Sequence, residues 1–296
     1  MNVTWRRLGV LVFAAVVAAC AASTPPSVPT HPKQRGLWVW NNLPAFDPGA
    51  RQALLSQTER FKLDTWYAQA QTLVYDNPLA LRDLVVAAAD RKIAVELLAG
   101  NHSWARSANH GQCVKIVSDL TQFVADSGEP RPTAIHLNIE PHALPDWPTS
   151  QAQLAGELLD LLAAVRPLVA GRGLALVYDM PNWYDDVVVT RNGQARPLSL
   201  WIADAVDRVV VMDYRDDPAV QLELVKQELA YGRATGKPVV VASEAACGVA
   251  ADETYCQEGA AALRKAMDAV RAALGAEAGF GGVAVHHFNA LEALPP

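Results

Sequence analysis

The stretch TAIHLNIEP (residues 133–141) shows the pattern that decides the fold. Side chains along a β-strand alternate between its two faces, so the three aliphatic residues share one face and His136, Asn138 and Glu140 share the other. The aliphatic face suits a packed interior. The polar face either is exposed to solvent or points into a functional site.

Short apolar runs bounded by turn residues recur along the chain, and eight of them are predicted to be strands. They span residues 36–40, 63–69, 92–100, 133–141, 173–181, 207–216, 237–245 and 281–289. Segments with helical periodicity lie between most of these runs, at residues 77–91, 150–170, 219–236 and 258–275. Strand and helix therefore alternate along the chain.

This alternation predicts an α/β fold with a parallel sheet and right-handed crossovers. Eight strands within residues 35–296 fit a (β/α)8 TIM barrel, which we expect to form a single domain. A doubly wound open sheet is the alternative. It is less favoured because WVWNNLPAFDPG (38–49), and not a glycine-rich phosphate loop, follows the first strand.

The N-terminal part of the chain carries export signals. Residues 1–19 have a basic start and a short apolar run, as in a signal peptide, and the run is too short to span a bilayer stably. The ending VAAC (17–20) resembles a bacterial lipobox, which implies cleavage before Cys20 and lipidation of it; a plain cleaved signal is the alternative. Residues 20–34, rich in Pro, Ser and Thr, are expected to form a tether. We therefore expect a protein of the bacterial cell envelope, held to a membrane by its lipid alone, on the outer membrane or the periplasmic face if the host has two membranes.

The net charge limits the classes of binding partner, and the cysteines bear on the redox compartment of the protein. The formal net charge of −6, without any basic run, argues against nucleic acid or anionic lipid as the main partner. Cys247 and Cys256 are close in sequence, and in an exported protein we expect a disulfide between them, which leaves Cys113 over. A thiol nucleophile would need a nearby base that the sequence does not identify.

The chemistry of a TIM barrel lies at the carboxyl ends of its strands, and here those ends are polar or aromatic. The candidate catalytic residues there are Asn138, Glu140, Asp179, Asp213, Tyr214 and Glu244. The candidate substrate-binding residues are Trp40, Tyr67, Trp104, Trp183 and His287. This combination indicates a glycan site, because aromatic faces stack on sugar rings and carboxylates serve as acid, base or nucleophile at the anomeric carbon. For His136, deeper in its strand, we expect only a role in satisfying other polar groups.

Two of these strand ends carry a family resemblance. HLNIEP (136–141) and VVMDYRD (210–216) resemble the barrel of chitinase-type glycoside hydrolases, whose fourth strand carries Asp-x-Asp-x-Glu and whose sixth carries Met-x-Tyr-Asp. Both family aspartates of strand four are changed, to His136 and Asn138, and Arg215 stands where the family has Asp. The Asn-x-Glu form resembles endo-β-N-acetylglucosaminidases, which use Asn with Glu for substrate-assisted hydrolysis.

A second resemblance is to retaining glycosidases with the same barrel, which place an acid/base Glu at the end of strand four and a nucleophilic Glu at the end of strand seven. The matching residues are Glu140 and Glu244, although Ile139 stands where those enzymes usually have Asn. Both resemblances imply Glu140 as general acid. They differ on whether the nucleophile is Glu244 or the acetamido group of the substrate. If the two carboxylates share one mouth, we expect the pKa of one of them to be raised.

The resemblances imply a glycoside hydrolase that acts on a glycan without a cofactor. No metal site is expected, because the seven histidines include no H-E-x-x-H and the adjacent His286 and His287 are expected to face opposite ways on a strand. VASEA (241–245) does not match the G-x-S-x-G of serine hydrolases. The alternative to an enzyme is a non-catalytic carbohydrate-binding barrel, which needs aromatic platforms but no matched pair of carboxylates.

Overall fold

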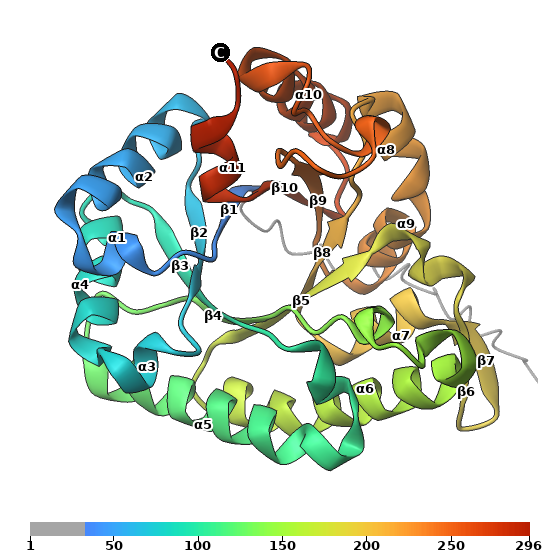
Figure 1. Ribbon diagram of the computed structural model, residues 1–296. Coiled ribbons are helices and arrows are strands. Elements are labelled where there is room, and N and C mark those ends of the chain that lie inside the picture. The colour runs from blue at the N-terminus through green and yellow to red at the C-terminus, as the bar shows by residue number, and fades with distance from the viewer. Residues whose placement is uncertain (1–32) are drawn as a thin grey trace, which may run out of the picture.

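Eight parallel strands close into a barrel in the computed structural model, which describes residues 33–296 (Figure 1). The strand order around the barrel is β1-β10-β9-β8-β5-β4-β3-β2. The strands are β1 (Gln34–Val39), β2 (Thr65–Gln69), β3 (Ala94–Ala99), β4 (Ala134–Leu137), β5 (Ala175–Pro181), β8 (Arg208–Met212), β9 (Val239–Glu244) and β10 (Phe280–His286). The predicted TIM barrel is therefore confirmed, and each predicted strand overlaps an observed one. The predicted signal peptide and Cys20 lie outside the described residues.

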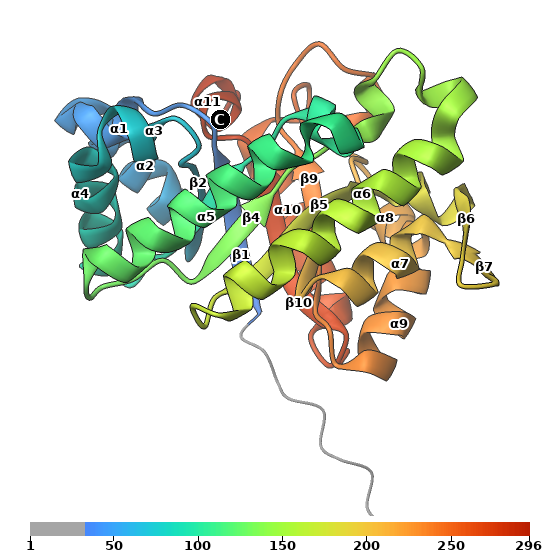
Figure 2. The ribbon, with the colours of Figure 1, turned by 90° about the horizontal axis from the view of Figure 1, so that it is seen from below.

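Helices form a ring around this barrel (Figures 1 and 2). They are α1 (Leu43–Phe46), α2 (Pro48–Arg60), α3 (Leu73–Asp76), α4 (Pro78–Ala89), α5 (His110–Ser127), α6 (Trp147–Ala170), α7 (Leu198–Ala205), α8 (Pro218–Leu224), α9 (Lys226–Thr235), α10 (Gly259–Leu274) and α11 (Phe288–Ala293). Among the described residues, none of the helices combines the length and the apolar character needed to cross a membrane.

Three of these helices begin with the same local signal, an Asp or Asn followed by Pro. The side chains of Asp47, Asn77 and Asp217 each accept a hydrogen bond from a backbone N–H in the first turn of α2, α4 and α8. The proline that follows occupies the first helical position, where its missing N–H costs nothing and its fixed φ suits the helix.

A hairpin between β5 and α7 interrupts the regular alternation. β6 (Val188–Arg191) and β7 (Gln194–Pro197) pair antiparallel and form a separate two-stranded sheet, seen beside α7 in Figure 2. The turn is Asn192-Gly193, and both residues have positive φ, 51° and 76°. Asn-Gly favours the hairpin turn because both residues tolerate this conformation. The hairpin is not among the predicted strands, although its Asn-Gly turn signal is present in the sequence.

The two faces of β4 enter two different environments, as the opening pattern predicted. Ile135 and Leu137 belong to the larger apolar core that includes residues of the surrounding helices. His136 points into the barrel, where it lies against the rings of Trp38 and Tyr67 at centroid distances of 6.1 and 4.3 Å.

Charged groups inside the barrel surround His136 on both sides. Its Nε2 lies 2.6 Å from Oδ1 of Asp179, and its Nδ1 lies 2.8 Å from Oε2 of Glu96. Trp38 Nε1 donates to the other oxygen of Asp179 at 2.9 Å, and Arg208 pairs with the other oxygen of Glu96. Burial lowers the pKa of His136, but the two carboxylates outweigh it and raise that pKa to about 9. His136 therefore has the structural role expected for it.

The raised pKa of His136 predicts a specific pH dependence of stability. The folded protein keeps this proton up to about pH 9, whereas the unfolded chain loses it near the ordinary value of 6.5. The contribution of His136 is thus present in full below about pH 6.5 and is lost as the pH rises to and through about 9. We expect urea titrations to show the free energy of unfolding falling across this range, and H136Q to lower it at neutral pH by about 3–5 kcal/mol.

The difference between wild type and H136Q isolates this effect from other groups that titrate at alkaline pH. We expect the difference to shrink as the pH rises through about 9. A difference that stays constant over the range would contradict a protonated His136.

Candidate active site

A cavity of about 370 Å³ opens at the carboxyl ends of β4, β5, β8 and β10, where a TIM barrel holds its chemistry. We call it the mouth cavity. Its lining residues are Asn138, Glu140, His142, Pro181, Asn182, Trp183, Met212, Tyr214, Arg215, Glu253 and His286. Three of the predicted catalytic residues, Asn138, Glu140 and Tyr214, are therefore brought together in one cavity.

Glu140 reaches this cavity from the loop that follows β4. Its side chain is 34% exposed, and Oε2 lies 3.2 Å from Nε2 of His142. The other ring nitrogen of His142 lies 3.0 Å from the hydroxyl of Tyr184, which orients the imidazole. Hydrogen bonding to His142 lowers the pKa of Glu140, and this effect, with help from Asn138, outweighs the burial that would raise it. The raised pKa expected of a general acid is thus not found at Glu140.

Glu244, the second predicted carboxylate, does not line the mouth cavity. Its side chain is only 5% exposed, and Oε2 lies 2.7 Å from Nδ1 of His286. Oε1 accepts hydrogen bonds from the backbone N–H groups of Ala245 and Ala246, at 2.8 and 2.7 Å. Both oxygens are engaged, so Glu244 stands behind His286 as its hydrogen-bond partner.

The partners of His286 define which of its nitrogens carries the proton. Trp40 Nε1, which can only donate, gives a hydrogen bond to Nε2 of His286 at 3.1 Å. Nε2 is therefore the acceptor, and the proton lies on Nδ1, from which it is donated to Glu244. The ring of Tyr214 stacks on the imidazole so fixed, with a centroid distance of 5.8 Å and an interplanar angle of 26°.

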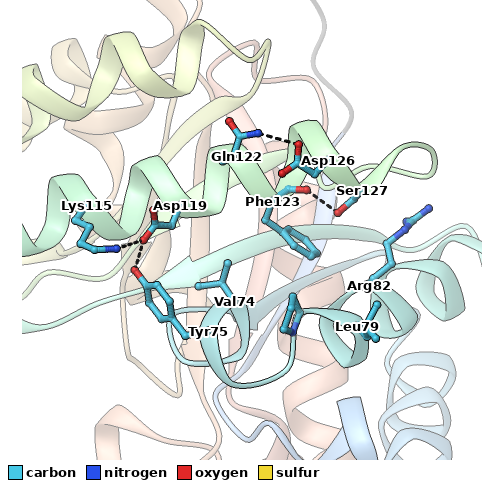
Figure 3. Close-up of a pocket in the computed structure, with 11 residues that line it drawn as sticks. Val74, Tyr75, Leu79, Arg82, Lys115, Asp119, Gln122, Phe123, Asp126 and Ser127 are labelled. Carbon is cyan, nitrogen blue, oxygen red and sulfur yellow. Dashed lines mark hydrogen bonds and ion pairs between the residues drawn. The ribbon is translucent and has the colours of Figure 1, made fainter.

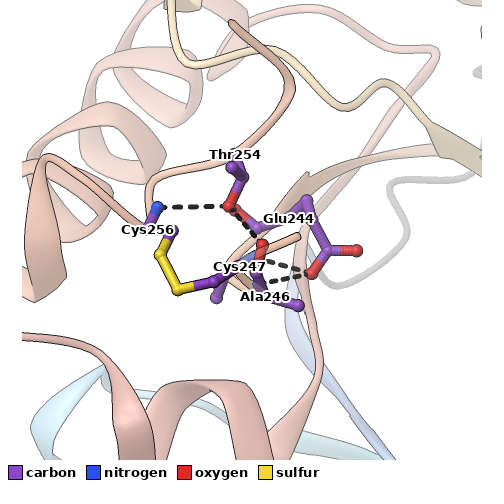
Figure 4. Close-up of a disulfide and its surroundings, with 6 residues drawn as sticks. Glu244, Ala246, Cys247, Thr254 and Cys256 are labelled. Carbon is purple, nitrogen blue, oxygen red and sulfur yellow. Dashed lines mark hydrogen bonds between the residues drawn. A yellow bond between two sulfur atoms is a disulfide. The ribbon is translucent and has the colours of Figure 1, made fainter. Parts of the chain in front are cut away.

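A disulfide restrains the loop that follows Glu244 (Figure 4). Cys247 and Cys256 are bonded, as predicted, and Thr254 donates to the carbonyl of Ala246 at 2.8 Å. This loop also carries Glu253 into the mouth cavity. The remaining described cysteine, Cys113, is buried, and burial raises the pKa of its thiol to about 12, so it is unsuited to act as a nucleophile.

The two predicted aspartates lie below the surface of the mouth cavity. Asp179 is held inside the barrel by His136 and Trp38. Asp213 is fully buried and accepts a hydrogen bond from Asn182 at 3.0 Å. Burial raises the pKa of Asp213 to about 7, against the opposing effect of that hydrogen bond. Neither carboxylate lines the cavity, so each could influence a ligand only through its neighbours.

Some of the predicted substrate-binding residues lie at the mouth cavity and others are buried away from it. Trp183 lines the mouth cavity and is 40% exposed, and Trp40 donates a hydrogen bond to His286. Tyr67 is fully buried inside the barrel, and Trp104 is buried in the outer core, so neither offers a face to a sugar. His287 does not line the cavity; its neighbour His286 does.

Seven of the residues that line the mouth cavity were not proposed from the sequence, and four of these seven carry titratable side chains: His142, His286, Arg215 and Glu253. The first three follow or end predicted strands, so their position was a usable signal. Glu253 arrives on the disulfide loop, which no strand pattern indicates. Among residues 33–296, no group of three or more His, Cys, Asp or Glu side chains is placed to hold a metal ion.

A larger hollow of about 610 Å³ lies outside the barrel, between the α3–α4 segment and α5 (Figure 3). Its polar groups pair with one another on the helix surface, since Asp119 accepts from both Lys115 and Tyr75. No carboxyl end of a barrel strand lies in this hollow, so the mouth cavity is the better candidate for an active site.

Comparison with solved structures supports the fold. The chain matches a chitinase from Pseudoalteromonas aurantia of family GH18 at 11% identity, with a TM-score of 0.55 and coverage of 88% of this chain and 98% of that one. It matches a chitinase from Chromobacterium violaceum at 14% identity, with a TM-score of 0.51 and the same two coverages. A GH5-4 endoglucanase from an uncultured bacterium matches at 12% identity, with a TM-score of 0.55 and coverage of 86% of each chain.

At these identities the likeness establishes a barrel of the kind that glycoside hydrolases use, and nothing finer. No protein-family model matches the chain, and no curated protein matches it in sequence.

The Trp40–His286–Glu244 arrangement predicts the result of E244Q. Gln keeps an acceptor for the two backbone N–H groups but turns an NH2 donor toward His286, which drives the ring proton to Nε2, where it opposes the N–H of Trp40. We expect the ¹⁵N NMR signals of His286 to change from the Nδ1–H to the Nε2–H form, and added W40F to relieve the conflict. H286N identifies the signals, and a wild-type ring already protonated at Nε2 would contradict the arrangement.

Proposed function

We propose that the mouth cavity binds a glycan and cleaves a glycosidic bond, with Glu140 as general acid. The observation that supports this best is the convergence of Glu140, Asn138 and Tyr214 on one cavity whose lining includes the exposed ring of Trp183. A carboxylate supplies the proton that the leaving oxygen needs, and an indole face can stack on a sugar ring. The fold shared with chitinases and an endoglucanase agrees with this proposal.

The engagement of Glu244 favours substrate assistance over direct displacement. In the proposed first step the acetamido oxygen of the substrate bonds to the anomeric carbon, the glycosidic bond breaks, and Glu140 gives its proton to the departing oxygen. In the second step water attacks the anomeric carbon, the bond between this carbon and the acetamido oxygen breaks, and the water gives a proton to Glu140, which restores both the acetamido group and the acid. Asn138 and Tyr214 would hold the acetamido group during both steps. Glu244 already accepts three hydrogen bonds behind His286, so it is poorly placed as a nucleophile.

A non-catalytic carbohydrate-binding barrel is the second candidate. Two observations favour it. The lowered pKa of Glu140 keeps that carboxylate ionised at neutral pH. Glu244, the other member of the predicted catalytic pair, does not line the cavity. Binding requires the cavity and Trp183 but no proton donor.

We propose further that the protein is exported and held to the bacterial cell envelope through a lipid on Cys20. The Cys247–Cys256 disulfide supports export, because such bonds persist in oxidising compartments. Mass spectrometry of the membrane fraction from cells that carry wild type or C20S would test the anchor.

E140Q separates the two candidate functions. The amide keeps the shape of the side chain but supplies no proton, so an enzyme should lose about 10²–10⁴-fold in kcat while glycan binding persists. Hydrolysis and calorimetric binding of N-acetylglucosamine, mannan and cellulose oligomers are the measurements, with E258Q on the exposed surface as control. Unchanged turnover in E140Q would overturn the role of Glu140, and binding without turnover in wild type would leave the non-catalytic barrel.

The contact between His142 and Glu140 predicts a shift of the pH profile. A general acid must be protonated, so activity should be lost as the pH rises through the pKa of Glu140, which His142 lowers. H142A removes this effect, and we expect the alkaline limb of the kcat/KM profile to move to higher pH. Y184F removes only the partner of the other ring nitrogen and serves as control. A limb that does not move in H142A would contradict the assignment.

A further inference from the structure

We infer that the glycan taken by the mouth cavity carries a carboxylate, as a uronic acid does, and that Arg215 binds this group. The inference rests on the proposed function only in that a glycan occupies the cavity. It adds a class of substrate and a residue that selects it.

Arg215 lies in the cavity wall, and some of its N–H donors have no hydrogen-bond partner among residues 33–296. Its side chain is 31% exposed and lines the mouth cavity beside Tyr214. The two hydrogen bonds that it makes within residues 33–296 both use Nη1: one to the backbone carbonyl of Tyr214 at 2.8 Å, the other to Oε1 of Glu253 at 3.4 Å. Nη2 and Nε therefore remain to form a two-point contact with a planar carboxylate, a geometry that guanidinium matches and ammonium does not.

The sequence around Arg215 departs from the resembling family at this one charge. Met212 and Tyr214 match the Met-x-Tyr of chitinase-type enzymes, but Arg215 replaces their Asp. The change reverses the charge presented to a sugar beside Tyr214. A cavity wall that is cationic at this point favours an acidic substituent on one of the sugars of the bound glycan.

Two carboxyl groups lie near Arg215: Glu253, and the buried Asp213, whose pKa the positive charge of Arg215 lowers without forming a hydrogen bond to it. Glu140 already has His142 as a partner. Glu253 is the competitor for Arg215, but their separation of 3.4 Å is long for a charge-assisted hydrogen bond, which is usually about 2.7–2.9 Å. The side chain of Glu253 is also 43% exposed, and solvent weakens the pair. A bound carboxylate would therefore replace a weak partner with a closer one.

Opposite effects of two variants test this inference. The probes are an oligosaccharide of alternating N-acetylglucosamine and glucuronic acid, the carboxyl methyl ester of the same oligosaccharide, and an N-acetylglucosamine oligomer. We expect wild type to bind the free acid about 10- to 100-fold more tightly than its ester, as a charge-assisted hydrogen bond implies. R215Q should abolish this preference, R215K should keep part of it, and E253Q should increase it because a competing carboxylate is removed.

Thermal melts establish that each variant is folded before its preference is measured. Wild type that does not distinguish acid from ester, or that binds none of the three probes, overturns the inference, as does an R215Q variant that keeps the preference. Loss of turnover in E140Q on a neutral oligomer, with no role for Arg215, would leave the proposed function standing while this inference fails. An acid preference lost in R215Q without any turnover would support the inference and count against catalysis.

Discussion

The imidazole of His136, held between two carboxylates inside the barrel, is the interaction on which the arrangement of the site depends. It joins β4 to Glu96 on β3 and to Asp179 on β5, and through them to Arg208 on β8 and Trp38 on β1. Charges buried at this depth are tolerated only when they are paired. β4 ends at Leu137, and the segment that follows it carries Asn138 and Glu140 to the lining of the mouth cavity.

Above this network, two pairs of Glu and His meet the mouth cavity in different ways. In the Glu140–His142 pair both side chains line the cavity, and hydrogen bonding to the imidazole lowers the pKa of the carboxyl group. In the Glu244–His286 pair only the imidazole lines the cavity, and the carboxylate is buried behind it. The same two residue types thus present an acid or base group at one wall and a fixed ring at the other, which is why the two glutamates are not equivalent partners across one bond.

The strand pattern was sufficient to predict the barrel, because eight apolar runs with intervening helical segments leave few other folds. It also placed Asn138 and Glu140 on one face. It could not predict depth: Tyr67 follows the same inward pattern as residues of the mouth but lies fully buried in the interior. Nor could it predict where residues of the loops lie. Glu253 reaches the cavity on the disulfide loop, and Trp104 packs in the outer core. His286, and not the proposed His287, lines the cavity, because which of two adjacent residues faces the mouth depends on how β10 ends.

The central claim is that a glycan binds in the mouth cavity with its scissile bond against Glu140. The most direct measurement is a crystal structure of E140Q with a bound oligosaccharide. We expect the side-chain amide at position 140 to lie within hydrogen-bond distance of a glycosidic oxygen, about 2.7–3.2 Å, with the sugar ring packed on Trp183 and flanked by Asn138 and Tyr214. Two results would contradict the account: an oligosaccharide bound in the hollow between the α3–α4 segment and α5, or one bound in the mouth cavity with every glycosidic oxygen beyond reach of residue 140.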